Sequence, residues 1–467
     1  MNVTSTPPDP DARLVRAIGI RSATLLVITN VIGSAIFLTP GVMAATLPSE
    51  SLLLLAWITG GAIAICGGLT YAEMGAMYPR SGGLYVFLEE AYGPLVAFLF
   101  GWACMLVVLT GGAATVAVGF ATYFSYFVPA LSTARQVVAL PTPWGAWSIS
   151  AGQMLAAVSI LGLGAVNYVG IETGNRLQAT LTVLKVAALA ALPIVALALH
   201  PATLTLTPVV PPLAARPLAS FGVVMIAVMW AYEGWYYLPF CAGEIADARR
   251  TVPIALVLGI SSLIVIYVTV NIAYMLALPL PEISGVQRIA EKALTALIGA
   301  GGARLVAATV VISTLGCNAA VVIAMSRACY AMASNGLFFK AAAAVHPKYR
   351  TPHVAIVMTC AWSAALTLTG TYEQLFTWVT FASVTFGVLG GLAIFRLRRL
   401  KPDVPRPYRT WGYPLVPALF VAGLSVLVVN TAIEKPKESL IGMILVALGF
   451  PAYWYWRARR RDSTLQS

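Results

Sequence analysis

The sequence predicts an all-α integral membrane protein with about twelve transmembrane helices, and three observations lead to this fold class. Of the 467 residues, 59% are hydrophobic and 10% are charged, and the mean hydropathy is +0.85. So few polar residues cannot cover the surface of a soluble protein of this length. Apolar runs of about 20 residues, roughly the length that crosses a bilayer, recur along the chain.

The predicted spans are the apolar runs that lie between clusters of charged residues, proline and glycine. They lie near residues 20–47, 52–78, 94–128, 149–169, 175–199, 219–246, 253–279, 303–333, 354–371, 374–396, 413–433 and 439–457. After the second span, Pro79 and the Gly82-Gly83 pair predict a turn, and an amphipathic piece from Leu84 to Tyr92 is expected to lie along the inner interface.

The distribution of basic residues predicts the orientation of the chain. The net charge is +12, and most of the 29 lysines and arginines fall in the connections on one side of the predicted spans, the side of the N-terminus. The positive-inside rule then predicts that both termini of this multi-pass membrane protein are cytoplasmic. The basic tail from Arg457 to Arg461 fits an anchor near anionic lipid better than a nucleic-acid-binding arm, so no nucleic acid is expected as a partner.

The first span contains helix-breaking residues in the middle of its apolar run. Gly33, Ser34 and Ala35 are small, and an unwound turn at mid-depth is tolerated only where it is buried in protein or lines a cavity. A half-helix beginning near Ile36 would direct its N–H groups at an anion, and a half-helix ending near Val31 would offer carbonyl groups to a cation. One break therefore predicts a receptor for a zwitterion.

The sixth span repeats this pattern, since Gly234 and Pro239 interrupt it beside Glu233. Interruptions in the first and sixth spans indicate a five-plus-five inverted repeat with a site at mid-membrane. The alternative is that both breaks are proline kinks with only a packing role. The predicted parts are a disordered cytoplasmic N-terminus (1–18), the first repeat (19–200), the second repeat (219–398), spans eleven and twelve (413–457) and a basic cytoplasmic tail (458–467).

Two charged residues lie inside predicted spans, where charge is costly and usually functional. Glu233 has three candidate roles: it holds a cationic substrate side chain, holds the substrate ammonium, or carries a proton. Its structural alternative is a partner such as a tyrosine hydroxyl or Lys185. Lys185 must be paired or deprotonated unless it snorkels to the interface. Ser313 and Thr314 of span eight are candidate partners, although such hydroxyls also bond back to their own helix.

Other polar residues favour structural roles. Glu73 lies near the inner end of the second span, where an arginine or a backbone donor is its expected partner. The six cysteines and three histidines lack the spacing of disulfides, metal ligands or a catalytic set, so we expect no metal, no cofactor and no enzymatic activity.

Several motifs together resemble the amino acid-polyamine-organocation superfamily, most closely its L-type amino acid transporter branch, whose animal members are light subunits of heteromeric exchangers. The resemblance covers about residues 15–400, and its motifs occur in the family's order. They are Gly33-Ser34-Ala35-Ile36-Phe37 with Pro40, the turn from Pro79 to Tyr85, Trp230-Ala231-Tyr232-Glu233-Gly234-Trp235, Glu244 with Arg249-Arg250-Thr251-Val252-Pro253, and Ser326-Arg327 with Gly336 and Thr351-Pro352.

The resemblance implies a LeuT-type fold and an amino acid exchanger that is not coupled to sodium. It also implies a role for each matching residue. The amides of Ser34, Ala35 and Ile36 would bind the substrate carboxylate, the carbonyls of Val31, Ile32, Trp230 and Glu233 its ammonium, Trp230 would cover the substrate as a gate, and Gly33, Ala231 and Gly234 complete the substrate site. Lys185 matches a family lysine that replaces a sodium ion and ties the first span to Ser313; Thr314 lies beside it.

The chain departs from the family pattern at two positions. Ala35 replaces the usual third glycine, which narrows the approach to the backbone. Glu233 stands where neutral-preferring members often have Gly or Ser, which raises lysine, arginine or ornithine as substrates. The animal light subunits join a heavy subunit through a cysteine in the outer loop after span three, and the loop 129–148 has none, so no disulfide-linked heavy subunit is expected.

We therefore expect a sodium-independent exchanger of cationic or neutral L-amino acids that works by alternating access. A proton-coupled importer, in which Glu233 or Lys185 titrates, is the alternative. A membrane receptor that binds without transport, and a channel, are remote alternatives, and the chain shows no charged ring or run of filter-like carbonyls that would favour a channel.

Overall fold

A computed structural model describes residues 18–78, 82–142, 145–169, 174–199, 217–334 and 336–465. The α-helices are α1 (Ile20–Val31), α2 (Ala35–Thr46), α3 (Glu50–Met77), α4 (Leu84–Tyr92), α5 (Pro94–Ala103), α6 (Leu109–Phe124), α7 (Ala151–Val169), α8 (Gly174–Leu199), α9 (Pro217–Ala231), α10 (Ala248–Ala277), α11 (Leu280–Ile283), α12 (Ile289–Ile298), α13 (Ala300–Ser334), α14 (His353–Thr367), α15 (Tyr372–Leu400), α16 (Leu415–Glu434), α17 (Pro436–Ala447) and α18 (Gly449–Leu465). A π-helix, η2 (Cys104–Val108), and three 3-10 helices, η3 (Pro129–Leu131), η4 (Trp235–Glu244) and η5 (Lys340–Ala343), complete the helical elements.

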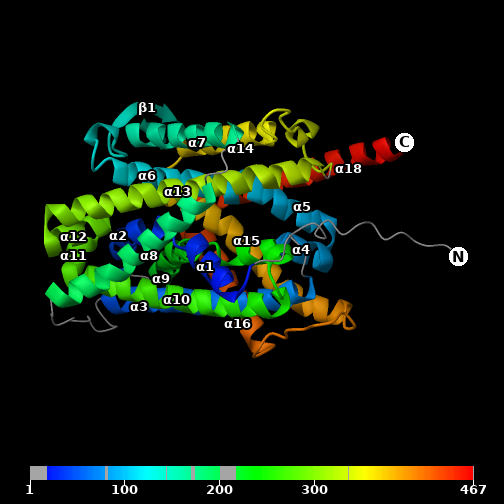
Figure 1. Cartoon of the computed structure of the whole chain (residues 1–467), viewed down its shortest axis with the longest axis horizontal. Coiled ribbons are helices and arrows are strands. Elements are labelled where there is room, and N and C mark those ends of the chain that lie inside the picture. The colour runs from blue at the N-terminus through cyan, green and yellow to red at the C-terminus, as the bar shows by residue number, and fades with distance from the viewer. Residues whose placement is uncertain are drawn as a thin grey trace.

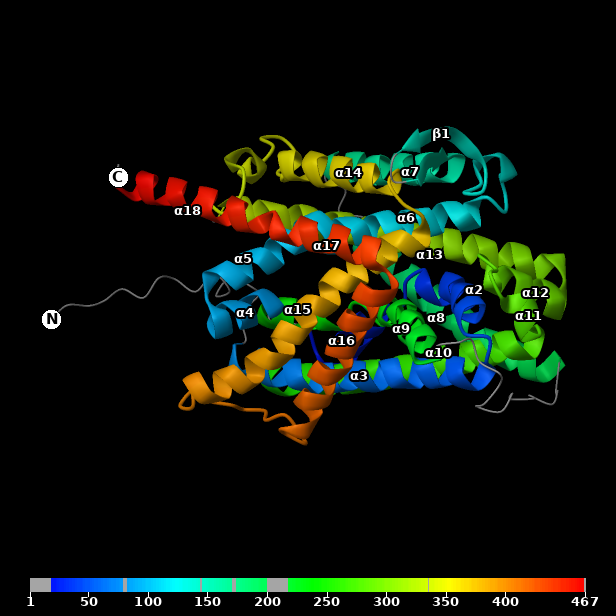
Figure 2. The same cartoon turned by 180° about the vertical axis from the view of Figure 1, so that it is seen from behind.

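The long helices run along the long axis of the molecule in layers (Figure 1). Helices α7 and α14 pack side by side on one face, α6 and α13 form the next layer, and α3 packs against α10 on the opposite side. The short helices α1, α2 and α9 lie between these layers. On the other side of the molecule, α15 and α16 cross the bundle obliquely (Figure 2). The broken helices are thus enclosed by longer helices.

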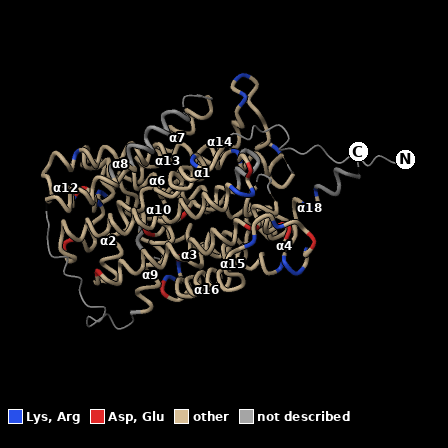
Figure 3. The backbone as a smooth tube through the Cα atoms, turned by 60° about the horizontal axis from the view of Figure 1, so that its bottom comes forward, with Lys and Arg blue, Asp and Glu red and all other residues tan. Residues whose placement is uncertain are grey.

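Charged residues lie mostly toward the two ends of the long helices, and the middle of the bundle carries few of them (Figure 3). This is the arrangement that a bilayer requires, because charge in hydrocarbon is costly. After the predicted topology, we call the end where α1 begins and α15 ends the inner end, and the opposite end the outer end.

Within the described residues, nine helical segments are long and apolar enough to cross a membrane, and the pair α1 and α2 adds a tenth. Two shorter apolar helices, Leu189–Leu199 within α8 and His353–Thr367 (α14), lie at the predicted fifth and ninth spans. The described residues therefore confirm a multi-span helical protein, with ten spans by length and composition where about twelve were predicted.

The first span is interrupted where the sequence predicted it. Helix α1 ends at Val31, Ile32 is extended (φ −72°, ψ 92°), and α2 begins at Ala35. The two half-helices are bent by 46° relative to each other. Gly33 has nothing within 4 Å of the position that a Cβ would take, so the unwound backbone is open on that side.

The second interruption is also present. Helix α9 ends at Ala231, a turn follows, and the chain continues from Trp235 as η4. Gly234 has φ +115°, and a Cβ at this residue would lie 2.8 Å from the carbonyl oxygen of Asn30 in α1. Only glycine combines this positive φ with so close an approach. The two breaks therefore lie directly against each other.

One β element, which the sequence analysis did not predict, lies in a connection between the helical spans. The connection between α6 and α7 contains an antiparallel hairpin of β1 (Gln136–Thr142) and β2 (Gly145–Ser150). The pairing is favoured by β-branched residues such as Val137, Val138 and Ile149. Strands of six or seven residues are too short to be found by a search for apolar runs of membrane-spanning length.

The inner end of the bundle is closed by polar contacts around Glu73, which is fully buried. Arg398 donates to its carboxylate from Nε at 2.9 Å and from a terminal nitrogen at 2.7 Å, and the backbone N–H of Thr410 donates at 2.6 Å. The predicted structural role of Glu73 is thereby confirmed. The predicted helix from Leu84 to Tyr92 is confirmed as well, as α4.

The third span contains a π-helical turn, η2, between α5 and α6. Side chains of α14 bond to the carbonyl groups of this irregular region: the indole N–H of Trp362 donates to Leu106 at 2.8 Å, and the hydroxyl of Ser363 donates to Thr110. Such turns persist where neighbouring groups satisfy the displaced backbone, which α14 does here.

Candidate substrate site at the two helix breaks

The start of α2 presents backbone N–H groups at the first break. The first N–H groups of any helix lack intrahelical acceptors, and the Ser34 side chain does not cap them. The first turn closes with a bond from the Phe37 N–H to the Ser34 carbonyl at 3.1 Å. The amides of Ser34, Ala35 and Ile36 thus lie at the positive end of a helix dipole, which suits a carboxylate.

The two helix ends that carry carbonyl groups meet at one tyrosine. The hydroxyl of Tyr267, on α10, lies 2.8 Å from the carbonyl oxygen of Ala231 and 3.2 Å from that of Val31. Tyr267 is fully buried, and its ring packs against Trp57. The Trp230 carbonyl accepts from the Glu233 N–H at 3.1 Å. Each of these oxygens keeps a second lone pair for another donor.

Glu233 lies at the second break with hydroxyl donors around its carboxylate. Ser383, on α15, donates to Oε1 at 2.6 Å, and the Tyr236 hydroxyl donates to the same oxygen. Among the described side chains, no lysine or arginine pairs with Glu233. Two hydroxyl donors stabilise a carboxylate but do not neutralise its charge.

A small cavity of about 40 Å³ adjoins the Glu233 carboxylate. It lies between α3, the second break, α15 and α16, and has room for roughly three water molecules. Its lining residues are Ile63, Ala64, Tyr71, Leu84, Phe100, Met229, Tyr232, Glu233, Trp235, Tyr236, Ser383, Val384, Gly387, Phe420 and Leu424. Three of its aromatic rings, those of Tyr71, Trp235 and Phe420, contact one another. Glu233 is thus the acidic residue in a wall that is otherwise mostly aromatic and aliphatic.

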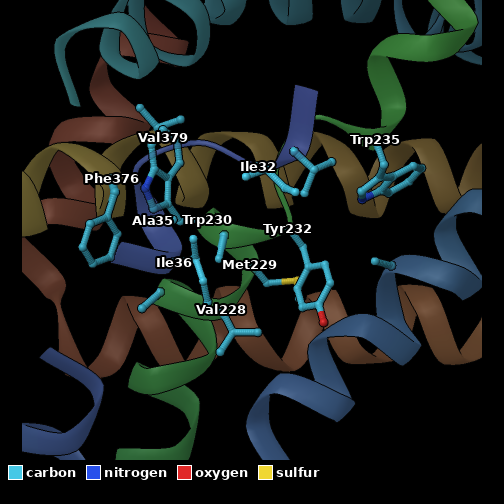
Figure 4. Close-up of a cluster of buried hydrophobic side chains, with 14 of the residues drawn as sticks. Ile32, Ala35, Ile36, Val228, Met229, Trp230, Tyr232, Trp235, Phe376 and Val379 are labelled. Atoms are coloured by element: carbon cyan, nitrogen blue, oxygen red, sulfur yellow. The ribbon is translucent and has the colours of Figure 1, made fainter. Parts of the chain in front are cut away.

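Trp230 lies on the outer side of Glu233, at the last turn of α9. Its ring stacks on Phe376 with centroids 6.5 Å apart and an angle of 14° between the planes. The close-up shows Trp230 and Phe376 beside Ala35 and Ile36 (Figure 4). Ser383 lies seven residues further along α15 than Phe376, about 10 Å toward the inner end. Trp230 therefore stacks on a second aromatic ring, and its role as a gate stays a prediction.

The structure describes the side chains of two of the three residues predicted to take part in coupling, which are Lys185, Ser313 and Thr314. Thr314, on α13, donates to the carbonyl of Val310 in its own helix at 2.7 Å, the alternative that the sequence left open. Ser313 is buried, with 6% of its surface exposed. The backbone of Lys185 lies in α8, which packs against α13, but its side chain lies outside the described residues. Its contact with Ser313 stays a prediction.

Comparison with known proteins identifies the family. A family model for amino acid permeases matches residues 18–450. The chain belongs to this family. The permease is 28% identical over 453 residues to the serine/threonine exchanger SteT of Bacillus subtilis (strain 168), a match that covers 96% of the permease and 99% of the relative.

Human relatives match over nearly the same length. The permease is 28% identical to Asc-type amino acid transporter 1 of Homo sapiens, over 96% of its own chain and 84% of the relative. It is also 28% identical to large neutral amino acids transporter small subunit 2 of Homo sapiens, over 95% and 81% of the two chains. The resemblance to the amino acid-polyamine-organocation superfamily and its L-type branch is confirmed.

Family membership settles several expectations. The permease is a multi-pass membrane transporter of amino acids and not an enzyme, and the family implies the LeuT-type fold. Sequence reasoning offered a tyrosine hydroxyl as a structural partner of Glu233, and Tyr236 is such a partner. Its assignment of the substrate-binding backbone groups stays a prediction, and it missed Tyr267, Tyr372, Phe376 and Ser383. Each of these contacts the site through tertiary packing, and no local pattern marks them.

Proposed function

We propose that the permease is a sodium-independent exchanger that accepts cationic and neutral L-amino acids by alternating access. One observation supports the cationic part: a carboxylate at mid-span lines a cavity, is held by hydroxyls and has no basic partner among the described side chains. A carboxylate at this depth costs about 2.5 kcal/mol or more, which a cationic substrate side chain would offset.

The backbone would hold the part that all amino acids share. The N–H groups of Ser34, Ala35 and Ile36 bind the α-carboxylate, and the carbonyls of Val31, Ile32, Trp230 and Glu233 accept the α-ammonium. These groups belong to two half-helices that approach each other at Gly234, which supports the assignment. Gly33 leaves room for the substrate backbone and Ala35 limits it, while Ala231 and Gly234 bring the second break against the first.

Trp230 covers the bound substrate, and Lys185 ties α1 to Ser313 in place of a coupling ion, with Thr314 beside it. The two interrupted spans are equivalent members of inverted repeats, residues 19–200 and 219–398. Opposite rocking of the repeats would expose the site alternately to each side of the membrane.

The permease resides in the bacterial inner membrane with both termini in the cytoplasm, and it works without a disulfide-linked heavy subunit. The full-length match to a bacterial exchanger supports this, as does the absence of cysteine from residues 129–148. Impermeant labelling of a cysteine placed in the loop 129–148 of intact cells tests the orientation, because that loop must be outside.

Counterflow in proteoliposomes tests exchange. Vesicles preloaded with unlabelled arginine and alanine should take up labelled arginine or alanine at least several-fold faster than empty vesicles, without sodium and without a pH gradient. Equal uptake by empty vesicles rejects exchange. Uptake that needs sodium rejects the sodium-independent mechanism.

The substitution Glu233→Gln tests the role of the carboxylate. We expect arginine and lysine to lose the ability to compete for labelled alanine exchange, while neutral amino acids keep it. Ser383→Ala keeps the carboxylate but removes one donor, so it should weaken arginine binding less than Glu233→Gln does. Glu373→Gln at the outer surface is the matched control and should change neither.

Proton coupling is the second candidate, because Glu233 is an acidic group at mid-span with no basic partner among the described side chains. In this case a pH gradient alone drives uptake into empty vesicles, and Glu233→Gln abolishes that uptake for neutral and cationic substrates alike. The same proteoliposomes therefore separate the two functions.

A further inference from the structure

Tyr372, the first residue of α15, joins the two half-helices that lie on the outer side of the breaks. Its hydroxyl accepts a hydrogen bond from Nε1 of Trp230 at 3.1 Å and lies 3.1 Å from Oγ of Ser34. In the contact between Tyr372 and Ser34 either hydroxyl can be the donor, because the Tyr372 oxygen has one proton and two lone pairs. One hydroxyl thus connects the end of α9, the start of α2 and the start of α15.

These contacts lie in a closed layer. Trp230 is 9% exposed and Ser34 is 1% exposed. On the outer side of this layer a cavity of about 10 Å³ lies between α2, α9 and α15, and Phe376 forms part of its wall. The larger cavity lies on the inner side, beside Glu233. Phe376, which stacks on Trp230, lines the outer cavity and not the larger one.

The geometry makes the closed layer depend on the hydroxyl. A buried indole N–H or serine hydroxyl without a partner is costly, so both groups need Tyr372 once water is excluded. When the layer opens, water satisfies them and the bonds to Tyr372 are not needed. Each such bond shifts an equilibrium by roughly 2- to 13-fold. The hydroxyl therefore favours the closed layer over the open one.

We propose that Tyr372 is the latch of the outer gate, a positioning residue that holds Trp230 over the site through its hydroxyl and joins this closure to the substrate-binding turn at Ser34. The proposal rests on the alternating access of the proposed function. The proposal gives α15 a role in closing the outer side of the site. The two bonds of the Tyr372 hydroxyl form only when the start of α15, the start of α2 and the end of α9 are in contact.

Thiol labelling without substrate tests the latch. In a background lacking the six native cysteines, Thr377→Cys places a reporter in the wall of the outer cavity, at a position that is 3% exposed. An impermeant maleimide is added outside right-side-out vesicles. We expect slow labelling in the parent and labelling several-fold faster in Tyr372→Phe, which removes one oxygen and keeps the ring.

Double substitution and a second reporter make the outcome decisive. Trp230→Phe should also speed labelling, and Trp230→Phe with Tyr372→Phe should add little to either change, because both remove the same bond. Tyr126→Phe, at the same end of the molecule, should leave the rate unchanged. Val224→Cys, on α9 in the same cavity wall, repeats the measurement from another helix.

Unchanged labelling of both reporters in Tyr372→Phe overturns the latch, and so does full additivity of the two substitutions. Because labelling needs no substrate, this failure is distinct from the failure of exchange in counterflow. A variant that elutes as an aggregate on gel filtration is replaced by Ser34→Ala, which removes the other partner of the Tyr372 hydroxyl and should speed labelling in the same way.

Discussion

The hydroxyl of Tyr267 lies 2.8 Å from the carbonyl oxygen of Ala231, the last residue of α9. The same hydroxyl is 3.2 Å from the Val31 carbonyl, at the end of α1. A single donor on α10 thus bridges the negative ends of two broken helices. Those ends would otherwise repel each other across the site, because each carries about half a negative charge.

Removal of the Tyr267 hydroxyl should weaken substrate binding more than it lowers the stability of the fold. We expect Tyr267→Phe to lower the free energy of unfolding by about 1 kcal/mol, the usual contribution of one hydrogen bond. KM for amino acid exchange should rise several-fold with little change in maximal rate, because the two half-helices lose their common donor. Proteoliposome kinetics measures the KM, and an unchanged value for Tyr267→Phe contradicts the bridging role.

Two glycines should respond differently to the same added methyl group. Gly234→Ala forces an L-residue to φ +115° and places Cβ against the Asn30 carbonyl, so the fold should lose about 1–3 kcal/mol or more. Gly33→Ala meets nothing within 4 Å and should keep its melting temperature. Its methyl group would project into the substrate approach, so transport should fall. Thermal unfolding and exchange assays separate the two effects.

The buried carboxylate of Glu73 should be important for stability. Glu73→Gln leaves Arg398 and the 8% exposed Arg406 without their common anion, and loss of one partner of a buried ion pair costs about 3–5 kcal/mol. Glu373→Gln breaks a pair with Lys435 at the surface, where Glu373 is 40% exposed, and should cost under about 1 kcal/mol. Equal melting temperatures for the two variants would contradict this difference.

Lys401 lies beyond the end of α15, and its contact with Glu90 should make the stability of the protein depend on pH. Its hydrogen bond to Glu90 of α4 raises the pKa of the Lys401 ammonium above the usual lysine value of 10.5. The folded state therefore holds this proton more tightly than the unfolded state, so the pair stabilises fully below pH 10.5 and loses its effect as pH rises through the raised pKa. The melting temperature of Lys401→Gln should approach that of the parent at alkaline pH.

The sequence predicted the two breaks because their causes are local. Gly33 and Gly234 interrupt apolar runs. Unpaired backbone groups or an acidic side chain in hydrocarbon are stable only where they line a cavity or contact protein or a ligand. Glu73 was assigned correctly for the same reason, since a buried acid requires a donor. These inferences need the properties of one segment at a time.

The residues that sequence analysis missed make contacts between segments that are far apart in the chain. Tyr372 and Ser34 are 338 positions apart in the chain, and Ser383 and Glu233 are 150 apart. A tyrosine or serine on an apolar helix has the same local appearance whether it bonds to its own backbone or to a distant helix. Only the packing of α15 against both breaks distinguishes the two.

The π-helical turn in the third span has a consequence for motion. One extra residue turns the side chains of α5 by about 100° relative to those of α6, so a single rod presents different faces at its two ends. Because Trp362 and Ser363 of α14 grip the irregular turn, the offset is fixed. The third span and α14 should then behave as one rigid unit, against which the broken helices tilt during transport.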